Sequence, residues 1–177
     1  PNPYDPSHPS RFVDWKAHGW VDVYSAIARS SNVYFYVVGG GFQDQKGLGI
    51  EKIREYWEKF GFDKVTRIDL PGEDVGFLPS PKWKEKTFGD IWRIGDTYNV
   101  SIGQGDFSIT PLRLVTAISA IANHGIAYVP HIKKTDKPEV LLDISEMEDS
   151  LAIVRAGMID GVVKDYGTGH MLDSIPL

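Results

Sequence analysis

The sequence predicts a helix-dominated α+β fold with few short strands, and three observations support this class. Residues 50–60, 111–122 and 145–162 repeat apolar residues at steps of three and four, the spacing of an amphipathic helix. Segments with strand character are short and few, namely residues 33–38 and 128–132. The length of 177 residues, with 42% hydrophobic and 24% charged residues, is typical of one globular domain with its own core.

The N-terminal part begins as an extended lead-in and continues as a helix. Residues 1–20 carry four prolines, which favour an irregular, extended chain. Asp22 is a suitable N-cap for a helix over residues 23–29, because its carboxylate can accept a free backbone N–H. Residues 33–38 are all aromatic or β-branched, so propensity alone predicts a buried strand there.

Residues 50–60 form a clearly amphipathic helix. Its apolar face consists of Ile50, Ile53, Trp57 and Phe60. Gly61 then supplies the left-handed backbone conformation that ends many helices. Residues 62–109 follow with repeated Pro and Gly turn signals, so we expect this stretch to be loop-rich.

A hydroxyl followed by proline marks the start of the next helix. Thr110 is the expected N-cap, and Pro111 fits the first turn because the N–H that it lacks would have no helical partner. The apolar face of this helix runs through Leu114, Ile118 and Ile121. Asn123-His124-Gly125 stops the helix, and residues 128–132 are a candidate for a short strand.

The last helix is expected to begin at Ser145, where Ser145 and Glu148 match a capping box. Its buried face continues at three- and four-residue steps through Met147, Leu151, Val154, Met158 and Val162. Gly167-Thr168-Gly169 closes it. Residues 21–61 and 110–170 are therefore expected to be mainly helical.

Charge and residue content exclude several classes of protein. The net charge is -5 with an isoelectric point near 5.5, and acidic residues are interspersed with the basic ones, which argues against nucleic-acid binding. Cysteine is absent, which excludes disulfides and thiolate chemistry. No apolar stretch approaches the about 20 residues of a membrane helix, and the N-terminus lacks a signal-peptide pattern. Because the chain starts with Pro rather than Met, we expect a processed chain or an excised piece.

Few residues outside one tripeptide have a pattern that suggests chemistry. The five histidines are scattered, and none pairs with another at metal-ligand spacing, so we predict no metal. Gly103-Gln104-Gly105 is too short for a dinucleotide fingerprint and indicates a tight loop, so we predict no cofactor. Asp69 and Glu73 flank Leu70-Pro71-Gly72 and are expected to be turn residues rather than an acid–base pair.

The tripeptide Ser30-Ser31-Asn32 follows the first predicted helix. Ser and Asn are common at helix ends because their side chains satisfy free backbone groups, so three residues alone are explained by local structure. The tripeptide gains significance from the segments around it, which keep a defined order and spacing. These segments are residues 28–36, 60–62, 68–73, 76–79, 83–84, 95–99, 101–105 and 110–112.

Together these segments resemble the class B penicillin-binding proteins, nearest to the cell-elongation type called penicillin-binding protein 2, over about residues 10–175. The resemblance implies that Ser30-x-Asn32 is the middle of three active-site motifs, between S-x-x-K, which carries the nucleophile, and K-T-G. As candidate catalytic residues, Ser30 would relay a proton, and Asn32 would hold the lysine and the substrate backbone. Residues 33–38 would be helical.

The first and third motifs are absent from this sequence. Ser80-Pro81-Lys82 is one residue too short for S-x-x-K, and Lys134-Thr135-Asp136 ends in Asp rather than Gly. Arg67 also departs from the family, in which glycine is usual before Ile68. We therefore expect residues 1–177 to be a partial transpeptidase domain, an interior portion of the mixed α/β, serine β-lactamase-like fold, and inactive alone.

The resemblance also implies a function and its setting. The parent would be a peptidoglycan D,D-transpeptidase that cross-links stem peptides through an acyl-serine intermediate and binds D-Ala-D-Ala ends and β-lactams. It would work with elongation-complex proteins at the periplasmic or extracytoplasmic face of the cytoplasmic membrane, anchored by an N-terminal helix outside this chain.

Other interpretations remain open. One alternative is a non-catalytic cell-wall scaffold or penicillin-sensing relative, and a third is a serine β-lactamase or penicillin receptor. Because the piece would lack most of the sheet against which its helices pack, we expect it either to self-associate or to stand alone as a helical subdomain.

Overall fold

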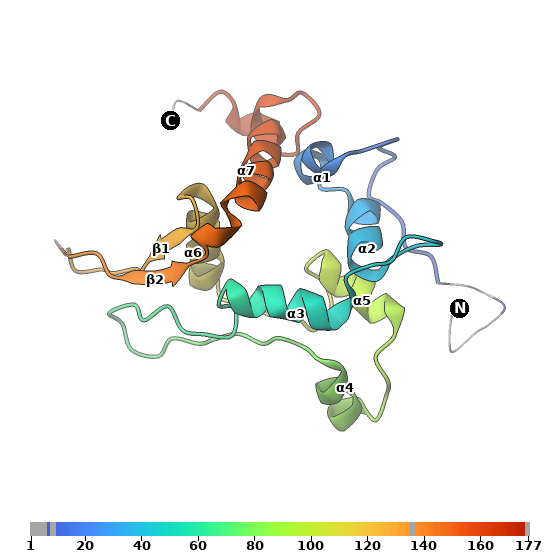
Figure 1. The fold of residues 1–177 in the computed structure, drawn as a ribbon, viewed down its shortest axis with the longest axis horizontal. Helices are drawn as coiled ribbons and strands as arrows, with labels where there is room; N and C mark the ends of the chain where they lie inside the picture. The colour runs from blue at the N-terminus through green and yellow to red at the C-terminus, as the bar shows by residue number, and fades with distance from the viewer. Residues whose placement is uncertain (1–6, 8–9, 135–136, 176–177) are drawn as a thin grey trace.

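The computed structural model describes residues 7, 10–134 and 137–175 and confirms the helix-dominated α+β class (Figure 1). Its helices are α1 (Val23–Arg29), α2 (Asn32–Gly40), α3 (Gly49–Lys59), α4 (Pro81–Phe88), α5 (Ile94–Ser101), α6 (Pro111–Ala122) and α7 (Glu148–Val163). Strands β1 (Ile126–Tyr128) and β2 (Val140–Asp143) pair antiparallel, and η1 (Ser145–Met147) and η2 (His170–Leu172) are 3-10 turns. The proline-rich start of the expected lead-in, residues 1–6 and 8–9, lies outside the described residues.

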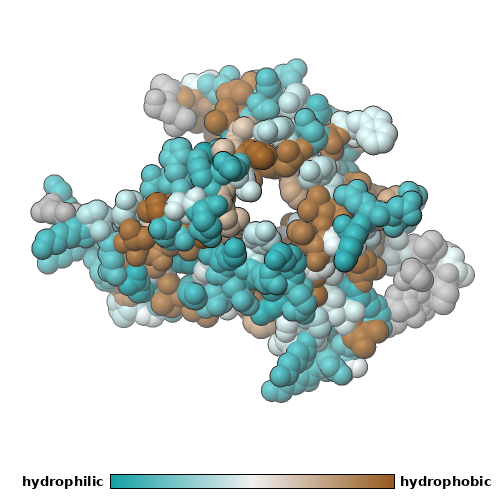
Figure 2. Space-filling model, in the orientation of Figure 1, coloured by the Kyte–Doolittle hydropathy of each residue, from teal (hydrophilic) through white to brown (hydrophobic). Residues whose placement is uncertain are grey.

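The elements are arranged in packed groups around an open centre. Helix α1 packs along α7, α2 packs against α5 and α3, and α6 packs against β1 and α7. Figure 2 shows a gap through the middle of the molecule that is bordered in part by hydrophobic side chains. The link between α1 and α2 therefore joins two of these groups, and it contains the tripeptide Ser30-Ser31-Asn32.

Helix α2 shows that the strand expected from propensity over residues 33–38 is wrong, and it confirms the helix implied by the family resemblance. At its start, the Ser31 side chain accepts the N–H of Tyr34 and so satisfies a group that the helix leaves free. At its end, a Cβ on Gly40 would collide with the ring of Tyr98, so glycine lets α2 approach α5 closely. Capping and packing thus override the β propensity of the side chains.

Most helix ends follow the capping chemistry expected from the sequence. Asp22 caps α1 with its carboxylate, as predicted. Thr110 accepts the N–H of Arg113 at the start of α6, with Pro111 in the first turn. Gly61 has a φ of 69° directly after the C-cap of α3, which confirms the left-handed position.

Residues 62–109, expected to be loop-rich, also contain α4 and α5. Helix α4 has clear end signals: Ser80 accepts the N–H of Trp83, Pro81 occupies the first turn, and Gly89 ends the helix with a φ of 66°. Each of these helices has only eight residues, which is too short for a convincing periodic apolar pattern. Cap signals therefore detect α4 where periodicity does not.

The capping box predicted for Ser145 and Glu148 is wrong. The Ser145 hydroxyl donates to Asp143 at 2.7 Å, and the Glu148 carboxylate binds Arg155 instead of the backbone of Ser145. The 3-10 turn η1 precedes α7, which begins at Glu148. The helix also ends at Val163, before the Gly-Thr-Gly segment expected to close it.

The strands and the core differ in part from the expected pattern. The strand expected at residues 128–132 shares only Tyr128 with β1, and β2 was not predicted. A buried cluster joins α6, β1 and α7, and its members are Ala120, Ala127, Ile144 and Leu151. Leu114 and Ile118, expected on the buried face of α6, are 44% and 40% exposed. Among the described residues, no helix is long and apolar enough to cross a membrane.

Candidate active-site motif

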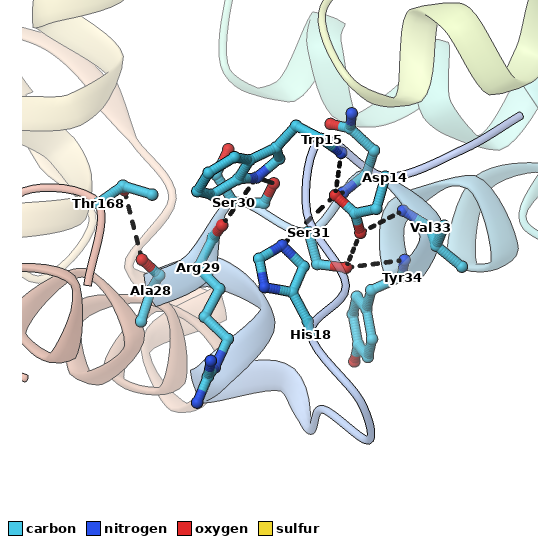
Figure 3. Close-up of polar contacts among 11 residues, drawn as sticks. Asp14, Trp15, His18, Ala28, Arg29, Ser30, Ser31, Val33, Tyr34 and Thr168 are labelled. Carbon is cyan, nitrogen blue, oxygen red and sulfur yellow. Dashed lines mark hydrogen bonds and ion pairs between the residues drawn. The ribbon is translucent and has the colours of Figure 1, made fainter. Parts of the chain in front are cut away.

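The tripeptide Ser30-Ser31-Asn32 forms the turn between α1 and α2 (Figure 3). Ser30 is the C-cap of α1 with a left-handed φ of 53°, and its N–H donates to the Ile27 carbonyl at 3.1 Å. Ser31 is the N-cap of α2, and Asn32 is the first residue of that helix. The motif thus occupies the boundary of two helices, where both backbones leave groups without intrahelical partners.

The three side chains of the motif have different environments. Ser30 is exposed and Asn32 is half-buried, and neither side chain forms a hydrogen bond with any residue in the described part of the chain. Ser31 is only 2% exposed, donates its hydroxyl to Asp14 at 2.7 Å and accepts the Tyr34 N–H at 3.4 Å. The first and third side chains are therefore available to other groups, whereas the middle one anchors the turn.

Asp14 is the acceptor for several donors of this turn. Its carboxylate accepts the Ser31 hydroxyl and the backbone N–H groups of Asn32 and Val33, at 3.1 and 3.2 Å for the two N–H groups. Burial by itself would raise the pKa of Asp14, but the hydrogen bonds from Ser31, Asn32 and Val33 outweigh it and hold the pKa below its ordinary value. Asp14 is therefore ionised at neutral pH.

Trp15 and His18 lie next to Asp14 (Figure 3). The Trp15 indole N–H donates to the carbonyls of Arg29 and Ser30, at 3.2 and 3.1 Å. His18 places Nε2 3.5 Å from the Asp14 carboxylate, and its ring meets the Trp15 ring edge to face with centroids 5.3 Å apart. The segment expected to be an irregular lead-in thus packs against the motif.

The segment that follows α7 contacts the last residues of α1, directly before the motif. Thr168 donates both its N–H and its hydroxyl to the Ala28 carbonyl, at 3.0 and 3.3 Å. The guanidinium of Arg29 lies 3.9 Å from the centroid of the Tyr166 ring. The Gly-Thr-Gly segment that was expected to close α7 instead binds the end of α1, directly before Ser30.

Among the described residues, the other candidates from the sequence have structural contacts and do not gather into a second site. Asp69 accepts the N–H groups of Ile132 and Lys133, which lowers its pKa, and Glu73 accepts the N–H of Arg67. Both carboxylates accept backbone N–H groups, in agreement with the prediction that these are turn residues. Within residues 7, 10–134 and 137–175, no three His, Asp or Glu side chains gather in a way that could hold a metal ion. Thr135 and Asp136 of Lys134-Thr135-Asp136 lie outside these residues.

Sequence reasoning did not assign Asp14 and Trp15 to the motif. They precede the residues that they bind in and beside the motif by 14 to 19 residues, so no local spacing rule connects them with it. A single Asp-Trp pair in a proline-rich region gives no periodic signal. Only the fold shows that its polar atoms meet the turn.

The fold and the motif are those of a class of proteins, and comparison with known proteins shows which family this is. Residues 2–176 match the penicillin binding protein transpeptidase domain, so the chain belongs to this family. This confirms the class suggested by the segments around Ser30-x-Asn32.

Among curated relatives, the chain is 34% identical over 176 residues to the peptidoglycan D,D-transpeptidase MrdA of Acinetobacter baumannii, covering 93% of this chain and 25% of the relative. It superimposes on a penicillin-binding protein (PBP2) from Helicobacter pylori with a TM-score of 0.82 and 34% identity, covering 97% of this chain and 31% of that one. The complex of Helicobacter pylori PBP2 with MreC gives a TM-score of 0.77 and 35% identity, and the match covers 92% of this chain and 30% of the chain in the complex. The chain therefore spans about a quarter to a third of the length of these three proteins.

Proposed function

We propose that this chain is the middle part of a peptidoglycan D,D-transpeptidase that cross-links stem peptides through an acyl-serine intermediate and is acylated by β-lactams. Ser30 relays a proton, and Asn32 holds the lysine of S-x-x-K and the substrate backbone. One observation carries this assignment. Ser30 and Asn32 keep their side-chain polar groups unengaged by the described residues, on a turn whose middle residue is anchored.

The chemistry of acyl transfer fits these two side chains. The reaction needs a nucleophile, a route for its proton and donors that hold the substrate amide. The serine of S-x-x-K, outside this chain, attacks the carbonyl carbon between the two D-Ala residues, and the terminal D-Ala leaves as an amine that takes up a proton. The exposed Ser30 hydroxyl suits the proton relay because it both donates and accepts. The Asn32 amide likewise offers an oxygen to a lysine ammonium and an N–H to a substrate carbonyl.

The whole protein is proposed to act outside the cytoplasmic membrane, anchored by an N-terminal helix that is not in this chain, and to contact elongation-complex proteins. The support is its likeness to PBP2 proteins, one of which was solved in complex with MreC. The 177-residue chain contains neither S-x-x-K nor K-T-G, so by itself it lacks the serine that is acylated and is inactive.

A fluorescent penicillin tests the proposal. A full-length protein that contains this chain should become covalently labelled, and the isolated chain should take no label. In the full-length protein, Ser30→Ala should slow labelling by about a hundredfold or more, because it removes the proton relay. Ser150→Ala, an exposed serine on α7, is the matched control and should label at the wild-type rate. A full-length protein that takes no label contradicts the proposal and favours the non-catalytic scaffold.

A further inference from the structure

Asp14 and Trp15 lie against the turn that joins α1 to α2 (Figure 3). We infer that these two residues are positioning residues for acyl transfer, because they fix the backbone that carries Ser30 and Asn32. The inference rests on the proposed function of those two side chains. It extends the site to a segment outside all three sequence motifs.

Asp14 holds the start of α2. The first N–H groups of a helix have no intrahelical acceptor, and the Asp14 carboxylate accepts those of Asn32 and Val33. It also accepts the hydroxyl of Ser31, which itself caps the helix. The Asp14 side chain is only 11% exposed, so water competes little for these bonds. These bonds thereby fix the position of the Asn32 backbone, and with it the direction of the Asn32 Cα–Cβ bond.

Trp15 holds the end of α1. Its single indole N–H is shared between the carbonyls of Arg29 and Ser30, which lie at a helix end and lack helical partners. Ser30 has a left-handed φ of 53°, a conformation that is unfavourable for a residue with a Cβ. A donor shared by two adjacent carbonyls, one of them that of Ser30, helps to keep Ser30 in this conformation.

The hydrogen bonds made by Asp14 and Trp15 act together because these two residues are adjacent in the chain. The Trp15 backbone N–H donates to the Asp14 carboxylate at 2.9 Å, so the two side chains are set relative to each other. Between them they bind one polar atom on each of residues 29–33, and none of these atoms belongs to the Ser30 or Asn32 side chain. Trp15 is 59% exposed, so burial of its ring contributes little to this role.

The experiment uses the full-length protein and a fluorescent penicillin, and it separates the limiting acylation rate constant from the penicillin concentration for half-saturation. The variants are Asp14→Ala, Asp14→Asn and Trp15→Phe. Asp14→Asn keeps one acceptor oxygen, and Trp15→Phe keeps an aromatic ring but removes the donor. The controls are Trp20→Phe, on a fully exposed tryptophan, and Thr110→Ala, which removes the N-cap of α6. Melting temperature and amide hydrogen exchange are measured on every variant.

We expect Asp14→Ala to lower the acylation rate constant by about ten- to hundredfold, with little change in half-saturation, because small misplacements of reacting groups have effects of this size. Asp14→Asn should recover part of the rate, Trp15→Phe should lose about tenfold, and Trp20→Phe should match the wild type. The amides of Asn32 and Val33 should exchange faster in Asp14→Ala, whatever the activity.

Two results would overturn only the inference about Asp14 and Trp15, and a third would also overturn the proposed function. An unchanged acylation rate in a folded Asp14→Ala or Trp15→Phe protein excludes positioning. Positioning is also excluded if Asp14→Ala and Thr110→Ala lower the melting temperature equally and lower the acylation rate equally. Asp14 then has only a structural role. A wild-type protein that takes no label contradicts the proposed function itself.

Discussion

Glu148 and Arg155 lie seven residues apart on α7 and are joined by two hydrogen bonds, with Nη1 and Nη2 of the guanidinium donating to opposite carboxylate oxygens at 3.2 and 2.5 Å. Nη1 of Arg155 also donates to the Ile121 carbonyl at 2.9 Å, near the end of α6. His124 contacts the same Glu148 carboxylate at 2.9 Å. The ion pair thus connects α7 with the end of α6.

This ion pair makes a pH-dependent contribution to stability. The hydrogen bond from Arg155, followed by that from His124, lowers the pKa of Glu148 from 4.5 to about 2. Because the folded pKa is below the unfolded one, the contribution is complete above the unfolded value and is lost as pH falls from about 4.5 to about 2. We expect Arg155→Met to raise the pKa of Glu148 toward 4.5, measured by an NMR titration of its carboxyl carbon. A pKa that stays near 2 in this variant contradicts the assigned cause.

Two glycines of α7 face α1 at different distances and predict opposite effects of alanine. A Cβ on Gly157 would lie 2.9 Å from Cβ of Ile27, whereas a Cβ on Gly161 would lie 3.6 Å from Cα of Ala28, an ordinary contact. We expect Gly157→Ala to lower the free energy of unfolding by about 1–3 kcal/mol through overpacking. Gly161→Ala should raise it by about 0.5–1 kcal/mol, because alanine favours helix. Urea denaturation measures both, and shifts of the same sign contradict this account of the α1–α7 contact.

Much of the fold follows from local chemistry that the sequence displays. Asp22, Thr110 and Gly61 mark helix ends because capping depends on one side chain and its nearest backbone. The capping box at Ser145 failed because Asp143 and Arg155 compete for its two side chains. Such competition depends on neighbours that a short motif does not include.

The sequence predicted the two candidate catalytic side chains of the site, but not the residues that hold their backbone in place. Ser30 and Asn32 were found from the motif and its neighbouring segments, although their catalytic roles remain a prediction. Asp14 and Trp15 were not found, because hydrogen bonds across 14 to 19 residues depend on how the chain folds back. Residues 33–38 illustrate the same limit. Their β propensity predicts a strand, but the cap at Ser31 and the close packing at Gly40 favour the helix that forms.

Arg67 stands where the family usually has glycine, and its φ of 62° gives the physical reason for that preference. Its side chain forms an ion pair with the Glu139 carboxylate at 2.6 Å, and both Arg67→Gly and Arg67→Ala remove this ion pair. The difference between these variants therefore isolates the backbone. We expect Arg67→Gly to be more stable than Arg67→Ala by about 0.5–1 kcal/mol, after allowing for the greater freedom of glycine in the unfolded chain. Equal urea midpoints would show that the left-handed conformation has no measurable cost here.

Leu114 and Ile118 lie one turn apart on α6 and are 44% and 40% exposed, next to Val115 at 56%. The chain matches only 31% of the PBP2 structure from Helicobacter pylori, so that relative has further segments available to cover such a face. In the described part of this chain these side chains stay exposed, and exposed apolar side chains on one helix favour association between copies. We expect the isolated chain to elute above the monomer mass in size-exclusion chromatography with light scattering. The double variant Leu114→Glu, Ile118→Glu should move it toward the monomer, whereas Met171→Glu, at a residue 81% exposed in η2, should not. A wild-type chain that is monomeric at all concentrations would instead indicate a helical subdomain that stands alone.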